Sequence, residues 1–226
     1  MECPECGKNI DENSSFCPFC GKKLENKVCQ KCLTAYNNSY EFCPKCGLKI
    51  CTQEEFNNIL NLQSKVQELY NEKKYSEAIE ILKIQLEYLP NPEPVLYLLG
   101  VCYFFLDDYD NSNEYLDKLM EVNPEYKGLW LKKAHIASKQ KDYDKAEEYC
   151  LKEIELHQDK DAYLHLISCY DTKGEYEKMD NALEDLSNTE GAKEYLLQVY
   201  NILDQSGDNL SEKDKLFKEK IKKKIF

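Results

Sequence analysis

Four cysteine pairs with the spacing Cys-x-x-Cys lie within the first 46 residues of this chain. Ten residues separate the first pair from the second, and ten separate the third from the fourth. A tetrahedral zinc ion takes four thiolates, and two such turns supply them. The repeated gap therefore predicts two consecutive sites. The predicted ligands are Cys3, Cys6, Cys17 and Cys20 for the first site, and Cys29, Cys32, Cys43 and Cys46 for the second.

Both predicted ions are structural, at two Zn²⁺ per chain. A site closed by four thiolates leaves no coordination position for a substrate, and the binding energy would fold a segment of this size. Disulfides and iron are the two alternatives for the same cysteines. A reducing compartment disfavours disulfides, while the short gap and the doubling favour zinc over iron.

The residues around the cysteines resemble the knuckles of the double zinc ribbon family over residues 1–50. In three pairs a proline presets the turn, and a following glycine permits the positive φ that lets amides point at the sulfurs. The third pair has neither, so we expect a looser knuckle at Leu33. Phe16 and Phe42 are expected to pack beside the metal. The three matching segments are Cys3-Pro-Glu-Cys-Gly, Cys17-Pro-Phe-Cys-Gly and Cys43-Pro-Lys-Cys-Gly.

A different pattern begins near residue 52 and repeats about every 34 residues. Tyrosines at 75, 109, 143 and 176 stand in similar short segments, 34, 34 and 33 residues apart. Between them, apolar residues recur at helical spacing. The pattern resembles the tetratricopeptide repeat family over about 52–190, in which each unit is a pair of antiparallel helices.

The expected fold is mainly α: a tetratricopeptide-like α-solenoid of antiparallel helix pairs, preceded by a small double zinc ribbon. The expected domains are 1–50, with two four-cysteine sites, and 52–226, which ends in a Lys-rich capping helix. Thr52 to Glu55 forms a capping box, and Gly207 marks a helix stop. The expected helices are 53–73, 75–89, 93–106, 109–122, 126–140, 143–157, 160–173, 175–188, 192–205 and 212–225.

The charge pattern argues against recognition of nucleic acid. The net charge is −12, and all 30 basic residues are lysine. Residues 1–50 and 213–226 each carry more lysines than acidic residues, so the acidic excess lies between them. An acidic body without arginine repels phosphates and lacks the side chain best suited to bind them. The tail, 213–226, could still contact RNA or anionic lipid.

The resemblance implies that the first helix of each pair lines a concave groove that binds a protein or peptide partner. We expect a partner with apolar anchors and basic flanks. The positions of a clamp for a C-terminal carboxylate hold mostly other residue types, so that function is not implied. Several groove candidates could instead pack between helices. The candidates are Tyr70, Tyr97, Val101, Phe104, Leu131 and His135.

The histidines and the helical cysteines stand outside catalytic motifs, and no Gly-rich phosphate loop is present. No membrane-length apolar run and no signal peptide are visible, so the expected location is cytoplasmic. We therefore expect a non-enzymatic zinc-binding adaptor. The alternative is a nucleic-acid-associated or zinc- or redox-responsive regulatory protein that docks through the ribbons and the Lys-rich tail. The identity of the partner and the oligomeric state stay open.

Overall fold

The structure is a computed structural model that describes residues 2–3, 5–11, 14, 16–24, 27–36, 40–206 and 210–225. Pro4 and Gly207, for which turn roles were expected, lie outside these residues. The chain divides into two compact units, Met1–Pro124 and Glu125–Phe226. The domain boundary predicted at 50–52 stays a prediction.

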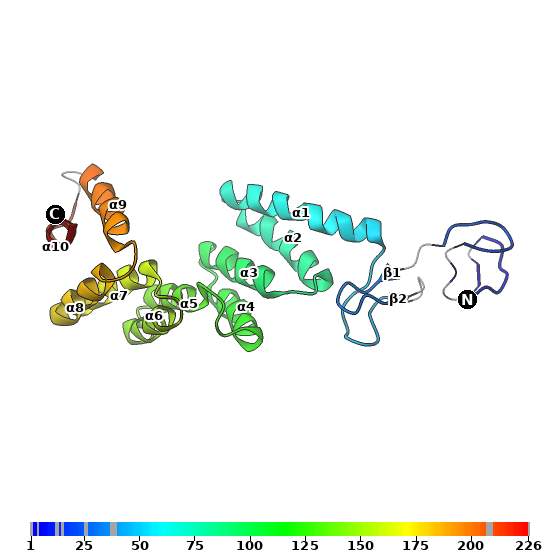
Figure 1. Cartoon of the computed structure of the whole chain (residues 1–226), viewed down its shortest axis with the longest axis horizontal. Helices are drawn as coiled ribbons and strands as arrows, with labels where there is room; N and C mark the ends of the chain where they lie inside the picture. The colour runs from blue at the N-terminus through cyan, green and yellow to red at the C-terminus, as the bar shows by residue number, and fades with distance from the viewer. Residues whose placement is uncertain are drawn as a thin grey trace. The chain divides into compact units, whose positions relative to one another are not determined.

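The first unit contains two short antiparallel strands followed by two helix pairs, and the second unit contains further helix pairs (Figure 1). The predicted fold, mainly α and of tetratricopeptide type, is confirmed. Within the described ranges, none of the helices has both the length and the apolar character that crossing a membrane requires. The elements are β1 (Lys27–Val28), β2 (Ala35–Tyr36), α1 (Gln53–Asn71), α2 (Tyr75–Tyr88), α3 (Glu93–Phe105), α4 (Tyr109–Val122), α5 (Leu129–Lys139), α6 (Tyr143–His157), α7 (Lys160–Lys173), α8 (Tyr176–Ser187), α9 (Ala192–Gln205) and α10 (Glu212–Ile225).

The same turn joins the two helices in four of the pairs. One residue in each turn has a left-handed backbone, with φ between 58° and 77°. The amide of the next residue donates to the carbonyl five residues earlier, at 2.8 to 3.0 Å. This arrangement ends a helix and turns the chain at once, so the next helix starts immediately. The left-handed residues are Lys73, Asp107, Lys141 and Gly174.

The helix starts follow local capping. The capping box predicted at Thr52 and Glu55 is present at the start of α1. Asp108 and Asp142 each accept a backbone amide of the first turn of the helix that follows, at 3.2 Å. These contacts satisfy donors that a helix N-terminus otherwise leaves open.

Each unit closes its own apolar core. In the first unit, α1, α2 and α3 share a cluster that includes Val66, Leu82 and Leu99. The helices α3 and α4 approach closely at Gly100, where an added Cβ would lie 2.8 Å from the side chain of Leu116. A glycine is therefore needed there for packing.

Helix α5 begins at Leu129, three residues later than expected, because Gly128 has a left-handed backbone with φ of 87°. The carboxylate of Glu153, on α6, accepts amides of residues 128, 130 and 131 at 2.7, 3.1 and 3.3 Å. Its side chain is fully buried. A negative charge is stabilised at a helix N-terminus, so this glutamate acts as a cap supplied from the paired helix.

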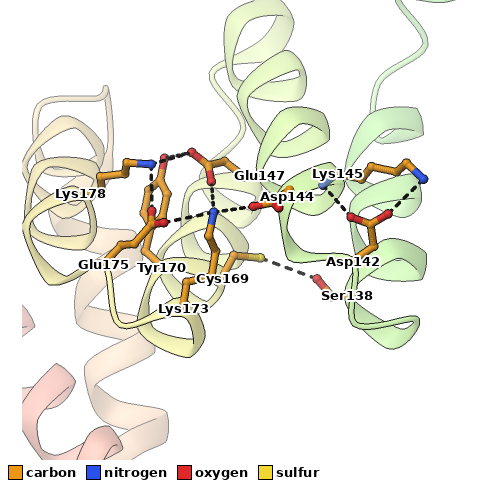
Figure 2. Close-up of polar contacts among 10 residues, drawn as sticks. All are labelled: Ser138, Asp142, Asp144, Lys145, Glu147, Cys169, Tyr170, Lys173, Glu175 and Lys178. Carbon is orange, nitrogen blue, oxygen red and sulfur yellow. Dashed lines mark hydrogen bonds and ion pairs between the residues drawn. The ribbon is translucent and has the colours of Figure 1, made fainter.

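A network of ion pairs joins α6, α7 and the start of α8 (Figure 2). The ammonium of Lys173 lies 2.8 Å from Asp144, 2.7 Å from Glu147 and 3.3 Å from Glu175. Glu147 also accepts from Tyr170 at 3.1 Å. Lys173 and Glu147 are mostly shielded from solvent, so this network holds better than isolated surface pairs do. It ties two consecutive helix pairs together.

The expected Lys-rich capping helix is α10. Ile221 and Ile225 are buried in the apolar cluster of the second unit. Lys218 pairs with Asp204 at 2.6 Å, and two further lysines, Lys220 and Lys224, pair with carboxylates of α8. The tail thus neutralises part of the acidic body within the same chain.

Replacing Glu153 by alanine should lower the free energy of unfolding of the second unit by about 2–4 kcal/mol, because three backbone donors lose their acceptor. The measurement is urea unfolding followed by the fluorescence of Trp130, the single tryptophan of the chain. The control is Glu155→Ala, at an exposed position of the same helix. Equal effects of the two changes would contradict the capping role.

Candidate metal centres and partner-binding faces

The four Cys-x-x-Cys segments form the same turn. In each, the amide of the residue after the second cysteine donates to the carbonyl of the first cysteine, at 2.8 or 2.9 Å. The amide of the first cysteine donates to the carbonyl five residues further on, at 2.8 to 3.0 Å. Each turn therefore presents its two sulfurs from a closed backbone loop.

The structure brings all eight predicted ligands together in the predicted sets of four. Within each set, the sulfurs lie within 4.8 Å of one another. The Sγ–Sγ distance is 3.6 Å for Cys3 and Cys20, and 3.5 Å for Cys29 and Cys46. A disulfide needs about 2.05 Å, whereas a tetrahedral zinc with bonds of about 2.3 Å separates its sulfurs by about 3.8 Å. Both sets fit a zinc ion.

The third knuckle keeps the shared turn without glycine. Leu33 has φ of 52°, close to the values of 68°, 72° and 75° at the three glycines. Its side chain is 78% exposed, so burial does not compensate for the left-handed backbone. The third knuckle therefore keeps the hydrogen bonds of the turn. It is less stable than the others because its leucine must adopt a left-handed backbone.

In each site, one cysteine has a pKa below the usual value of a thiol, so it ionises readily. Burial alone would raise the pKa of Cys17, but amides of Phe19 and Cys20 outweigh it and lower the pKa to about 6. Burial likewise opposes the thiolate of Cys43, but the Tyr36 hydroxyl and two backbone amides lower its pKa to about 6. Zinc binds the thiolate form, so these bonds favour the metal-bound state.

Tyr36 was not among the residues that we expected at the second site. Its hydroxyl lies 3.3 Å from the sulfur of Cys43. Strand β2, which carries it, is only two residues long, and the antiparallel pairing with β1 sets its position. A single tyrosine in such a segment gives no sequence signal for contact with a sulfur.

The expected packing of Phe16 and Phe42 beside the sulfurs is wrong. Their side chains are 57% and 52% exposed. The apolar contacts with the buried cysteines come from Ile10 and Leu24 in the first ribbon and from Ile50, Leu48 and Tyr36 in the second. These residues follow each knuckle, at the point where the chain returns past the cysteines.

On α3, three candidates for partner contact share one face, at spacings of four and three residues. Val101 is buried and packs inside the unit, whereas Tyr97 and Phe104 are half-buried. Tyr70, on α1, packs in an aromatic cluster with Tyr75 and Phe105. The rings of Tyr75 and Phe105 are stacked, with 4.9 Å between their centroids. Neighbouring rings therefore hold Tyr70 and Phe104 in place.

In the second unit, half-buried Leu131 and His135 lie on α5. The ring of His135 lies 4.3 Å from the ring of His165 on α7. Burial first, and then the charges of His165 and Lys132, lower the pKa of His135 to about 3. Ser138 contacts His165 Nε2 at 2.9 Å. Burial also lowers the pKa of His165, so both rings are neutral at pH 7, and they join the first helices of two consecutive pairs.

The family comparisons agree with this organisation. A double zinc ribbon model matches residues 3–47, and a tetratricopeptide repeat model matches 93–126 and 128–159. The chain therefore joins a double zinc ribbon to tetratricopeptide repeats. The chain is also similar to the Sol locus transcriptional repressor of Clostridium acetobutylicum, with 30% identity over 128 residues. That match covers 54% of this chain and 39% of the repressor.

Solved structures of MamA resemble the helical part. A MamA crystal structure is 21% identical, with a TM-score of 0.51, and the match covers 59% of this chain and 73% of that one. MamA 41-end from Desulfovibrio magneticus RS-1 is 20% identical, with a TM-score of 0.52, covering 74% and 93%. At this level of identity the likeness concerns the fold alone.

We predict opposite effects from exchanging glycine and leucine in the second site. Leu33→Gly removes a left-handed leucine and should tighten zinc binding severalfold, since about 1 kcal/mol of backbone cost disappears. Gly47→Leu should weaken binding by a similar factor, although an added Cβ meets no atom within 4 Å. Competition with a chromogenic chelator measures both. Unchanged zinc affinity in Gly47→Leu would contradict the role of the left-handed backbone.

Proposed function

We propose that this fusion of a double zinc ribbon to tetratricopeptide repeats is a non-enzymatic scaffold that binds a protein or peptide partner. Each ribbon holds one structural Zn²⁺ through its four cysteines. The first helices of the helix pairs carry the partner contacts, through Tyr70, Tyr97 and Phe104 in the first unit and Leu131 and His135 in the second. Val101 supports its face from within.

The aromatic face of the first unit is the observation that supports partner binding most directly. Tyr97 and Phe104 stay half-buried after the helix pairs have closed their cores. Phe105, beside Phe104 at 5.6 Å between ring centroids, is 44% exposed. Rings held by other rings lose little side-chain entropy on binding, and aromatic residues dominate the energetics of protein interfaces. A partner with apolar anchors fits such a face.

The chemistry of the remaining cysteines supports a role without catalysis. Burial raises the pKa of Cys102 to about 11 and also raises the pKa values of Cys51, Cys150 and Cys169. These thiols are protonated at pH 7, so they are poor nucleophiles. The two metal sites are closed by four thiolates each, which leaves no position for a substrate.

The charges favour a partner with basic flanks over nucleic acid. The chain has a net charge of −12. Lys218, Lys220 and Lys224 of the tail already pair with carboxylates of α8 and α9, which lowers the positive field that α10 offers to phosphates. The reducing cytoplasm, where zinc thiolates persist, is the compartment that we propose.

Gene regulation is a second candidate function. The relative of which the chain spans about two fifths is named a transcriptional repressor, at 30% identity over 128 residues. This chain could reach such a role by holding a protein regulator through its aromatic face, or by contacting nucleic acid through its ribbons. Treatment with nuclease separates the two routes.

Affinity capture of the tagged full-length chain, with and without nuclease, tests the proposal. We expect a protein partner that survives nuclease and falls at least fivefold when Tyr97 and Phe104 are both changed to alanine. The control is Tyr176→Ala, which removes a ring that is 52% exposed on α8, the second helix of its pair. Fluorescence of Trp130 and the helical circular dichroism check that the variants fold. Recovery dominated by nucleic acid that disappears with nuclease would contradict partner binding.

A further inference from the structure

The second ribbon passes into the first helix without a linker. The amide of Val28, on β1, donates to the carbonyl of Cys51 at 2.8 Å, so residue 51 still belongs to the hydrogen bonding of the ribbon. The next residue, Thr52, is already the N-cap of α1. Ile50 and Cys51 are only 3% and 2% exposed. The start of α1 is therefore fixed by the fold of the second ribbon.

A second contact joins this ribbon to the end of α2. The ammonium of Lys49 lies 2.7 Å from the carboxylate of Glu87 and 5.1 Å from the ring centroid of Tyr88. Lys49 comes three residues after the predicted ligand Cys46, and it pairs with Phe42 across the knuckle. The knuckle that supplies two ligands to the second site thus also contacts the last turn of α2.

Two lysines of the first ribbon, unlike Lys49, make their contacts within the ribbon. Lys22 pairs with Glu5 at 3.5 Å, and Lys8 lies 4.7 Å from the ring centroid of Phe19. Both contacts join residues of the first ribbon itself. The two ribbons share one knuckle geometry, but Lys49 of the second ribbon contacts helix α2, and the chain of that ribbon passes through Cys51 directly into α1.

We infer that zinc in the second site controls the stability of the first helix pair, whereas zinc in the first site does not. This inference rests on the proposed binding of zinc. Metal supplies the folding energy of a small ribbon, and a helix end that is hydrogen-bonded into that ribbon shares the stabilisation by linkage. Loss of the second zinc releases the start of α1 and the end of α2. Tyr70 of α1 is part of the aromatic face, so zinc in the second site acts as an effector of partner binding.

Matched ligand variants of the full-length chain test the inference. Cys20→Ser and Cys46→Ser remove the last ligand of the first and the second site, respectively. Amide hydrogen exchange is followed by mass spectrometry in peptides from α1 and α2, with peptides from α6 as the internal reference. We expect Cys46→Ser to speed exchange in the first turns of α1 and the last turn of α2 at least tenfold. Cys20→Ser should leave exchange there within twofold of the unchanged chain.

A third variant tests the contact itself. Lys49→Met leaves every cysteine in place and removes the bond to Glu87, so it should speed exchange at the end of α2 while zinc content is retained. The control is Lys45→Met, in the same knuckle, whose ammonium lies 3.4 Å from the hydroxyl of Thr34 inside the ribbon.

Zinc content, determined by chelator titration of each variant, separates the two possible failures. If the unchanged chain binds no zinc, the proposed metal function fails. If Cys46→Ser loses its zinc and the exchange of α1 and α2 is unchanged, only the inferred coupling fails. Equal acceleration by Cys20→Ser and Cys46→Ser would overturn the assignment of control to the second site.

Discussion

Thiolates that are gathered at one point repel one another, and this repulsion opposes the folding of the first 51 residues. Four sulfurs lie within 4.8 Å of one another in each ribbon, and the buried apolar residues around them are few: Ile10 and Leu24 in one ribbon and Ile50 in the other. Packing of this extent contributes little folding energy, and without metal the pKa values of Cys20 and Cys32 are raised to about 12, so four thiolates do not persist together. A divalent cation at the centre would balance the charge of four thiolates and supply the missing folding energy. The hydrogen bonds of the knuckles, and the start of α1 beyond them, depend on that charge balance.

The helical part depends on a backbone device instead. In four of the pairs, one left-handed residue ends the first helix and places the next amide on a carbonyl five residues back. The chain reverses within two residues, so the apolar faces of the two helices meet at once. Where this turn recurs, successive pairs pack on one another within each unit. Ion pairs between Lys173 and its three carboxylate partners then join neighbouring helix pairs, in addition to the apolar packing.

The functional proposal follows from what these two devices leave exposed. Both use polar groups internally, in four-cysteine sites, caps and ion pairs. Among the groups that stay partly accessible on the first helices are aromatic side chains, such as Tyr97 and Phe104, on an acidic body. Such a surface suits recognition of another chain, and the direct junction at Cys51 and Thr52 gives the metal a means to influence it.

Much of this architecture could be predicted from local sequence patterns. Cysteine spacing identified both sets of four sulfurs, and the 34-residue period placed the helix ends to within a few residues. Features set by contacts between distant residues were not predicted. Glu153 occupies a position typical of the surface of an amphipathic helix, and only the fold places it at the start of α5. Tyr36 approaches Cys43, and His165 approaches His135, for the same reason. The solvent exposure of Phe16 and Phe42 was not predicted either, because an aromatic residue beside a cysteine does not indicate which way its ring points.

Native mass spectrometry of the 226-residue chain, purified without added metal or chelator, determines what the two four-cysteine sites hold. We expect a folded species heavier than the bare chain by two zinc ions, with all twelve cysteines reduced. Acid, which protonates the thiolates, should release both ions and unfold the ribbons. A folded ribbon that contains iron, or disulfides among the eight cysteines and no metal, would show that zinc does not hold these sites.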